Sequence, residues 1–174
     1  MKHWIEQDVE QAKQREAGIA KSQDWQRHKA DKLARESSSF WERLRATLAA
    51  DAQAIGASGG AQITISAKNS DPGPETIRAE RGKSPRLGFD LSHEQTTLAM
   101  WLRYYHRSNG ARDDKGSRII LLIDVDDADG ELGARIDGSD SSELLALDDL
   151  SRKLLRPLLF GDLQEVVKQG LVKS

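Results

Sequence analysis

The spacing of apolar residues changes at a glycine-rich segment, residues 56–60, and this change limits the possible folds more than any other feature of the chain. From Leu33 to Ile55, apolar residues recur every three or four positions, which predicts an amphipathic helix over residues 33–56. Beyond the glycines, apolar and polar residues alternate, as they do in half-buried strands. The chain therefore combines a helical part with a sheet.

The alternating segments predict an antiparallel meander of five or six strands over residues 61–137. The first four are separated by short turn-forming runs, whereas a parallel crossover needs about a dozen residues or more. A longer connection, Ser108 to Gly116, leads to Ile119–Ile123. Because that segment is apolar at every position, we expect a strand covered on both faces. Residues 132–136 resemble a short return strand.

Residues 140–172 are expected to form C-terminal helices packed on the sheet. Asp140 and Glu143 resemble a capping box that opens a helix, and leucines between residues 144 and 158 give it a broad apolar face. Pro157 should kink or end this helix, and Asp162 should begin a last short one. The predicted fold is α+β, with one domain over residues 33–174.

The first 32 residues are rich in helix-forming residues but poor in apolar ones. A thin apolar stripe comprises Trp4, Ile5, Val9, Ala12 and Ile19, while Trp25 stands among charged residues. Such a helix is frayed, exposed, or packed against something outside its own domain. We therefore expect a polar helical arm over residues 1–32 that overhangs the domain, with Gly18 as a point of interruption.

Composition narrows the classes of protein to which the chain can belong. The net charge is −2, with a net basic middle (57–118) and a net acidic end (119–174), whereas general nucleic-acid binders carry a clear basic excess. The chain has no cysteine, which suits a reducing cytoplasm. The longest apolar run is Ile119–Ile123, and the N-terminus lacks the apolar core of a secretory signal, so we expect neither a membrane span nor export.

Motifs for catalysis, metals and cofactors are missing from the sequence. When Gly130 is aligned as position 6 of a calcium-binding loop, Val125 and Ile136 occupy the first and last ligand positions, so the acidic segment 124–130 reads as a hairpin turn. The histidines do not have metal-site spacing, and no phosphate-binding glycine loop precedes a helix. We expect a non-enzymatic protein without a cofactor; a weaker enzyme hypothesis would use His93, Glu94 or His106.

The segment Trp101–Arg107 is the most informative part of the predicted sheet. If Leu98, Met100 and Leu102 face the helices, then Trp101, Arg103, Tyr105 and Arg107 share the opposite face, beside the apolar strand 119–123. Tryptophan, tyrosine and arginine concentrate at protein interfaces, and also on platforms that stack single-stranded nucleic acid. The chain's own helices could equally cover this face.

The first functional hypothesis is a scaffold-like or adaptor-like interaction protein in the cytoplasm that associates with itself. Its interface candidates are Trp101, Arg103, Tyr105 and Arg107 on the sheet, and Trp4 and Trp25 on the arm. The alternative is a nucleic-acid-binding module that uses the Arg103, Tyr105 and Arg107 face.

Overall fold

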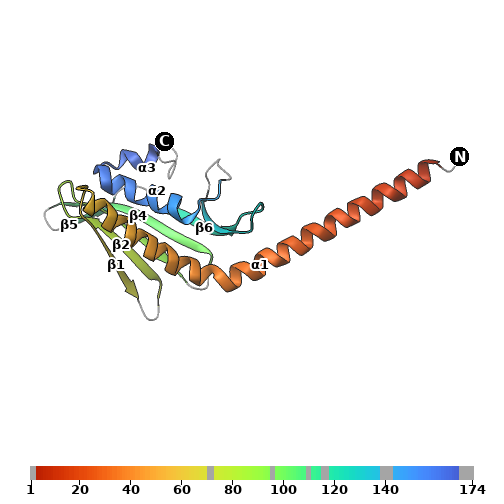
Figure 1. Cartoon of the computed structure of the whole chain (residues 1–174), viewed down its shortest axis with the longest axis horizontal. Coiled ribbons are helices and arrows are strands. Elements are labelled where there is room, and N and C mark those ends of the chain that lie inside the picture. The colour runs from red at the N-terminus through yellow and green to blue at the C-terminus, as the bar shows by residue number, and fades with distance from the viewer. Residues whose placement is uncertain are drawn as a thin grey trace.

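The computed structural model describes residues 3–69, 73–94, 97–108, 111–114, 118–137 and 143–168. These residues form an α+β fold in which a long N-terminal helix and two C-terminal helices accompany an antiparallel sheet (Figure 1). In chain order, the elements are α1 (His3–Ala57), β1 (Ile63–Asn69), β2 (Glu75–Arg81), β3 (Leu87–His93), β4 (Ala99–Ser108), β5 (Ala111–Asp114), β6 (Ile119–Val125), β7 (Leu132–Ile136), α2 (Leu147–Phe160) and α3 (Gln164–Lys168).

All strand pairs of the sheet are antiparallel, and six strands follow one another in the order β1-β2-β3-β4-β6-β7. The short strand β5 pairs only with the end of β4. The predicted meander is therefore confirmed, but the connection expected over 108–116 contains β5, because β4 continues to Ser108 and folds back on itself. This extension was missed because residues 111–114 lack an apolar alternation.

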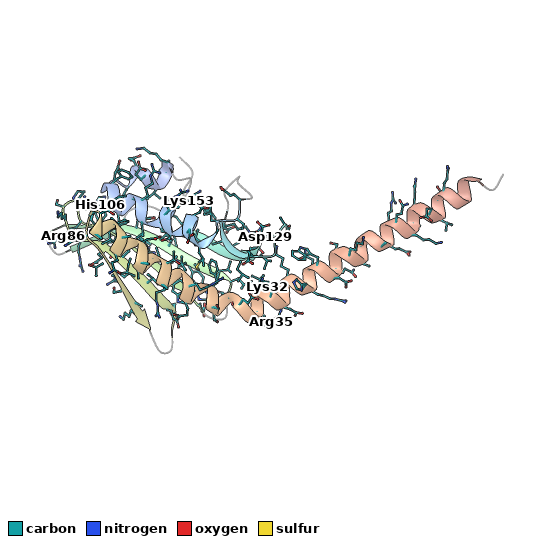
Figure 2. The ribbon with its side chains drawn as sticks, viewed as in Figure 1. Lys32, Arg35, Arg86, His106, Asp129 and Lys153 are labelled. Carbon is teal, nitrogen blue, oxygen red and sulfur yellow. The ribbon has the colours of Figure 1, made fainter. Side chains whose placement is uncertain are left out.

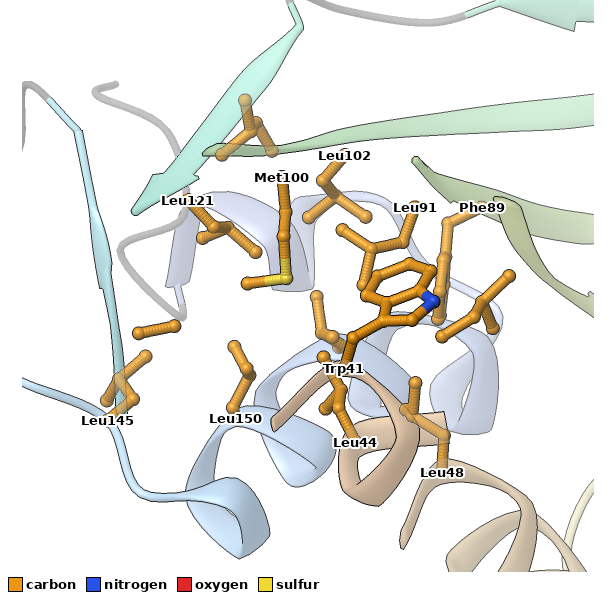
Figure 3. Packing of buried hydrophobic residues seen from close by; sticks show 14 of the residues in the cluster. Trp41, Leu44, Leu48, Phe89, Leu91, Met100, Leu102, Leu121, Leu145 and Leu150 are labelled. Atoms are coloured by element: carbon orange, nitrogen blue, oxygen red, sulfur yellow. The ribbon is translucent and has the colours of Figure 1, made fainter. Parts of the chain in front are cut away.

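The core lies between one face of the sheet and the helices α1 and α2 (Figure 3). The predicted stripe of α1 is buried as expected: Leu33, Phe40, Leu44, Leu48 and Ala52 are at most 8% exposed. They meet side chains from the strands, among them Phe89, Leu91 and Met100, all fully buried. The Tyr104 hydroxyl donates a hydrogen bond of 3.0 Å to the Leu154 carbonyl of α2, which ties that helix to the same face. We call this the inner face.

Helix α1 is continuous from His3 to Ala57, so the predicted interruption at Gly18 is wrong. A single glycine within a helix costs only about 1 kcal/mol relative to alanine, and residues such as Glu16, Ala17, Ala20 and Lys21 favour the helix on both sides. In Figure 1 the N-terminal half of α1 extends away from the rest of the molecule.

Two further predictions of local structure are wrong. Strand β6 is covered on one face only, because Ile120 and Leu122 on the outer face are half-buried, whereas Leu121 and Ile123 are buried. Helix α2 begins at Leu147 rather than at the proposed capping box; Glu143 precedes the helix, and Asp140 lies outside the described residues. Leu145 instead forms an isolated β-bridge with Ala134. This pairing with a distant strand keeps Leu145 out of the helix that its spacing predicted.

The ends of the C-terminal helices follow local backbone chemistry. Pro157 does not end α2, which continues to Phe160 and stops at Gly161, a residue with a left-handed φ of 69°. The predicted start of the last helix is confirmed, since the Asp162 carboxylate accepts a 2.8 Å hydrogen bond from the Gln164 backbone N–H. The predicted end of that helix near Gly170 lies outside the described residues.

Candidate interaction surfaces

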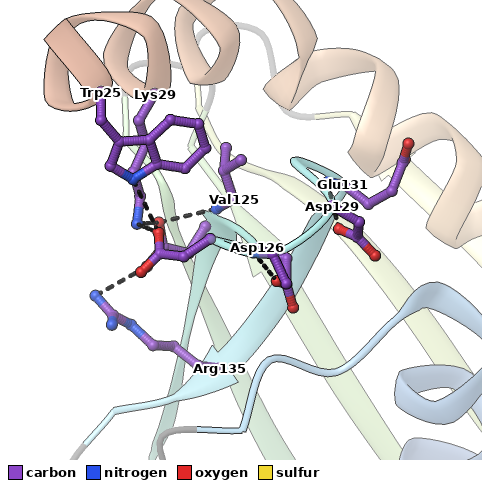
Figure 4. Close-up of polar contacts among 10 residues, drawn as sticks. Trp25, Lys29, Val125, Asp126, Asp129, Glu131 and Arg135 are labelled. Atoms are coloured by element: carbon purple, nitrogen blue, oxygen red, sulfur yellow. Dashed lines mark hydrogen bonds and ion pairs between the residues drawn. The ribbon is translucent and has the colours of Figure 1, made fainter. Parts of the chain in front are cut away.

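A cluster of polar side chains fastens α1 to the turn between β6 and β7 (Figure 4). Trp25 Nε1 donates a hydrogen bond of 3.1 Å to Asp127 Oδ1, and the Trp25 ring stacks on His28 with centroids 5.8 Å apart. Lys29 Nζ lies 2.8 Å from Asp124 Oδ1 and 3.6 Å from Asp127 Oδ1. We call Trp25, Lys29, Asp124, Asp127 and Arg135 the arm clamp.

Asp124 is the centre of the arm clamp. Its carboxylate is 7% exposed and also lies 3.1 Å from Arg135 Nη2, while Oδ1 accepts a 2.9 Å hydrogen bond from the Val125 N–H. Burial alone would raise the pKa of Asp124, but the hydrogen bond from Lys29, the Val125 N–H and the nearby cationic charges outweigh it and lower the pKa. Asp124 therefore stays ionised and holds α1 in a defined direction.

The turn beside the clamp is a self-contained hairpin. Asp126 Oδ1 accepts a hydrogen bond from the Ala128 N–H, Asp129 Oδ1 accepts one from the Glu131 N–H, and Gly130 takes a left-handed φ of 75°. These carboxylates thus accept hydrogen bonds from the backbone of the turn itself, and segment 124–130 forms the hairpin turn that the sequence predicts. Among the described residues, no group of three or more histidine, aspartate or glutamate side chains could hold a metal ion.

N-terminal to the arm clamp, no described part of the molecule covers the side chains of α1. Every described side chain from Gln7 to Asp24 is exposed, including the apolar Val9 (47% exposed) and Ile19 (58%). Figure 2 shows these side chains projecting around the helix, with Lys32 and Arg35 marking the region where it reaches the sheet. Residues 3–24 span about 33 Å at 1.5 Å per residue. We call this segment the exposed arm; the clamp residues Trp25 and Lys29 lie inside the arm expected over 1–32.

The outer face of the sheet carries the predicted set of Trp101, Arg103, Tyr105 and Arg107. Their inner-face neighbours Met100, Leu102 and Tyr104 are buried, which confirms the predicted alternation there. Leu98, also expected to face the helices, precedes β4 and is 38% exposed. Trp101 is half-buried and pairs with Ser92 on β3 and Ile120 on β6. The guanidinium of Arg118 lies 5.0 Å from the centroid of the Trp101 ring, so one side of this ring already has a cationic neighbour.

Tyr105 is buried although it lies on the outer face. It is 1% exposed, and its ring covers Gly88 so closely that a Cβ atom added there would lie 2.5 Å from Tyr105 Cζ. The Tyr105 hydroxyl donates a hydrogen bond of 2.8 Å to Glu80 Oε1, and Arg107 Nη1 lies 3.2 Å from Glu80 Oε2. Burial, and next the Glu80 hydrogen bond, raise the Tyr105 pKa. Tyr105 is therefore a packing residue of the sheet.

Ion pairs occupy much of the remaining outer face. Arg78 binds Asp90 through two hydrogen bonds, of 2.9 and 3.2 Å, in a bidentate arrangement. Both C-terminal helices and the packed part of α1 lie toward the inner face, so within the described residues the outer face is covered by its own side chains. Arg103 and Arg107 remain exposed, and Arg103 and Trp101 help to line a hollow of about 180 Å³.

A larger groove of about 830 Å³ lies between the end of α1 and α2. Its apolar lining includes Ile55, Leu155 and Phe160, and Phe160 is 58% exposed. Sequence analysis missed this groove because it depends on how two helices far apart in the chain pack side by side.

The histidine pair of the enzyme hypothesis does not converge on a reaction site. His93 is 1% exposed and packs against Trp41 with ring centroids 5.1 Å apart, while its Nε2 lies 3.0 Å from the Thr97 carbonyl. Burial lowers the pKa of His93. Its neighbour Glu94 is exposed, and His106 pairs with Leu87 at the other end of β3.

No family model, curated protein or solved structure matches the chain. None of the described helices is long and apolar enough to cross a membrane.

The interface residues predicted from the sequence lie in separate places: Trp25 belongs to the arm clamp, and Trp101, Arg103, Tyr105 and Arg107 lie on the outer face. Trp4 lies in α1, with its side chain outside the described residues.

Proposed function

We propose that this chain is a non-enzymatic interaction protein that self-associates through the exposed arm. The observation that supports the proposal is a helix that continues through residues 3–24 although all its described side chains there are exposed. The clamp at Asp124 directs this helix outward, so the arm is presented as a defined surface.

Helix energetics explain why such an arm favours a partner. Isolated helices in water are marginal, and most helical stability in proteins comes from packing an apolar stripe. The arm contains a stripe of that kind, with Val9 and Ile19 about half exposed. Burying each of these side chains in an interface would contribute roughly 1–2 kcal/mol. A second arm would supply that cover symmetrically, as in the common two-fold dimers.

The test compares apolar residues of matched exposure on the arm and on the body. Val9 (47% exposed) and Phe160 (58%) are both about half exposed, so Val9→Glu and Phe160→Glu make similar changes at different surfaces. Light scattering after size exclusion should show the wild-type and Phe160→Glu chains as oligomers and Val9→Glu as a monomer. An oligomer lost only in Phe160→Glu would move the interface to the α1–α2 groove and overturn the proposal.

A second candidate is a nucleic-acid-binding module on the outer face. Its support is the exposure of Arg103 and Arg107 on one open strand face, whereas the buried Tyr105 ring offers no stacking surface. Fluorescence anisotropy with single-stranded oligonucleotides at low salt tests this candidate, because phosphate-driven affinity falls steeply with salt. Lack of binding at low salt rules it out.

For either candidate we propose a cytoplasmic location, in keeping with the cysteine-free sequence.

A further inference from the structure

We propose that two copies of the chain pair through their exposed arms in antiparallel orientation, with Asp8 of each arm opposite Arg15 of the other. This inference rests on the proposed self-association and adds the orientation and register of the pairing. It follows from the spacing of the apolar stripe and from the distribution of charge along the arm.

The apolar stripe of the arm has coiled-coil spacing. Val9, Ala12 and Ile19 follow one another at steps of three and seven residues, which places Val9 at an a position and Ala12 and Ile19 at d positions of a heptad; the charged Glu16 occupies the intervening a position. These residues are all exposed. A stripe this narrow suits a single partner helix, since packing on a sheet requires a wider apolar face.

Charge divides the arm into two halves of opposite sign. Asp8 and Glu10 lie toward the N-terminal end of the arm, and Lys13, Arg15 and Lys21 lie C-terminal to them, where Glu16 and Asp24 are the acidic exceptions. All of these side chains are exposed and therefore accessible to a partner. An antiparallel pair sets the acidic half of each arm against the basic half of the other, whereas a parallel pair aligns halves of like sign.

The heptad positions select one antiparallel register. If Val9 lies opposite Ala12 of the second copy, the flanking g positions bring Asp8 opposite Arg15, and symmetry repeats this pair. A register one heptad longer would set Val9 opposite Ile19 but bring the two Arg15 side chains together. Like charges at that position oppose the longer register.

Glu16 argues against a parallel pair. A parallel coiled coil could still join Asp8 to Lys13, but it would place the two Glu16 carboxylates opposite each other at an interior a position. In the antiparallel register the two Glu16 residues are about 16 Å apart along the axis, at 1.5 Å per residue. The repulsion is therefore absent from the antiparallel pair.

The first test is a charge exchange at low ionic strength. Arg15→Glu and Asp8→Arg should each weaken self-association roughly tenfold, because each reverses one member of both symmetric pairs. An equimolar mixture of the two variants restores both pairs in a heterodimer, so its affinity should return to the wild-type value. Unchanged affinity of Arg15→Glu would overturn the inference, since a parallel pair does not use Arg15.

The second test measures orientation directly and uses the absence of cysteine in the chain. Single cysteines at Gln14 or Lys21, both on the outward side of the heptad, carry spin labels for pulsed electron paramagnetic resonance. The antiparallel register separates the two labels by about 10 Å along the axis for Gln14→Cys and about 31 Å for Lys21→Cys. The Lys21 distance should therefore exceed the Gln14 distance, whereas a parallel pair gives equal distances.

The outcomes separate this inference from the proposed function. An oligomer with equal label distances contradicts the antiparallel pairing but leaves self-association through the arm intact. An oligomer that Val9→Glu does not dissociate, or a chain that is monomeric throughout a dilution series, contradicts both. A dimer whose Lys21 labels are the farther apart and whose charge variants rescue each other supports both.

Discussion

Asp124 shows how one side chain can set the direction of a whole helix, because it bonds α1, β7 and its own backbone at once. We expect Asp124→Ala to lower the free energy of unfolding by about 2 kcal/mol, as it leaves Lys29 partly buried without this partner. Denaturant unfolding measures the loss. The matched control is Asp127→Ala in the same clamp: that carboxylate is 77% exposed, so the cost should stay below about 1 kcal/mol. Equal losses would contradict the central role of Asp124.

His93 should make the stability of the body depend on pH. Because burial lowers its pKa in the folded state below the ordinary value of 6.5, the unfolded chain binds more protons as the pH falls below about 6.5. Stability contributed by the neutral ring is present above that pH and is lost progressively below it. Denaturant unfolding at pH 7.5 and 5.5 should show this decrease in the wild type and a smaller one in His93→Gln. An equal decrease in both would assign the effect to other groups.

Gly88 leaves room for the Tyr105 ring, a role that its position in the sequence does not reveal. A Cβ at this position would lie 2.5 Å from the Tyr105 ring and 2.8 Å from the Ala79 carbonyl oxygen. We expect Gly88→Ala to destabilise the sheet by about 1–3 kcal/mol through overpacking, measured as a decrease in the thermal midpoint. A midpoint equal to that of the wild type would show that the Tyr105 ring can move aside.

At the level of elements, the predictions that succeeded depend on short-range patterns. The stripe from Leu33 to Ile55 and the alternation in β2, β3 and β4 each follow from which residues must leave water. The predictions that failed depend on tertiary partners: Leu145 pairs with Ala134 instead of extending α2, and the outer side of β6 stays half-buried since both long helices lie on the inner face. Trp25, an interface candidate from the sequence, bonds to Asp127 within the chain, and spacing cannot predict a contact between residues 102 positions apart.

Gly18 gives a test of the arm as an independent element. No atom lies within 4 Å of a Cβ added there, so Gly18→Ala gains helix propensity of about 1 kcal/mol without steric cost. Circular dichroism should show increased helicity, while the thermal midpoint of the body stays unchanged, because the arm does not contact the core. A large shift of the midpoint would mean that the arm and the body unfold as one unit.

The whole molecule consists of a packed body and an exposed arm. Replacing an apolar residue by a charged one should therefore have different effects on stability in the two parts. Leu44 is fully buried, so Leu44→Asp should unfold the body, whereas Ile19→Asp should leave the body folded. Thermal unfolding followed in the near ultraviolet distinguishes the two variants. Similar midpoints would contradict the division into body and arm.

Hydrogen exchange at increasing protein concentration tests self-association through the arm most directly. Amides of residues 7–24 lie on a helical segment whose side chains are all exposed, so protection beyond that of the helix itself requires a partner. We expect their exchange to slow as concentration rises, while exchange in the central strands β3 and β4 stays constant. Arm exchange that is fast and identical at every concentration would contradict self-association through the arm.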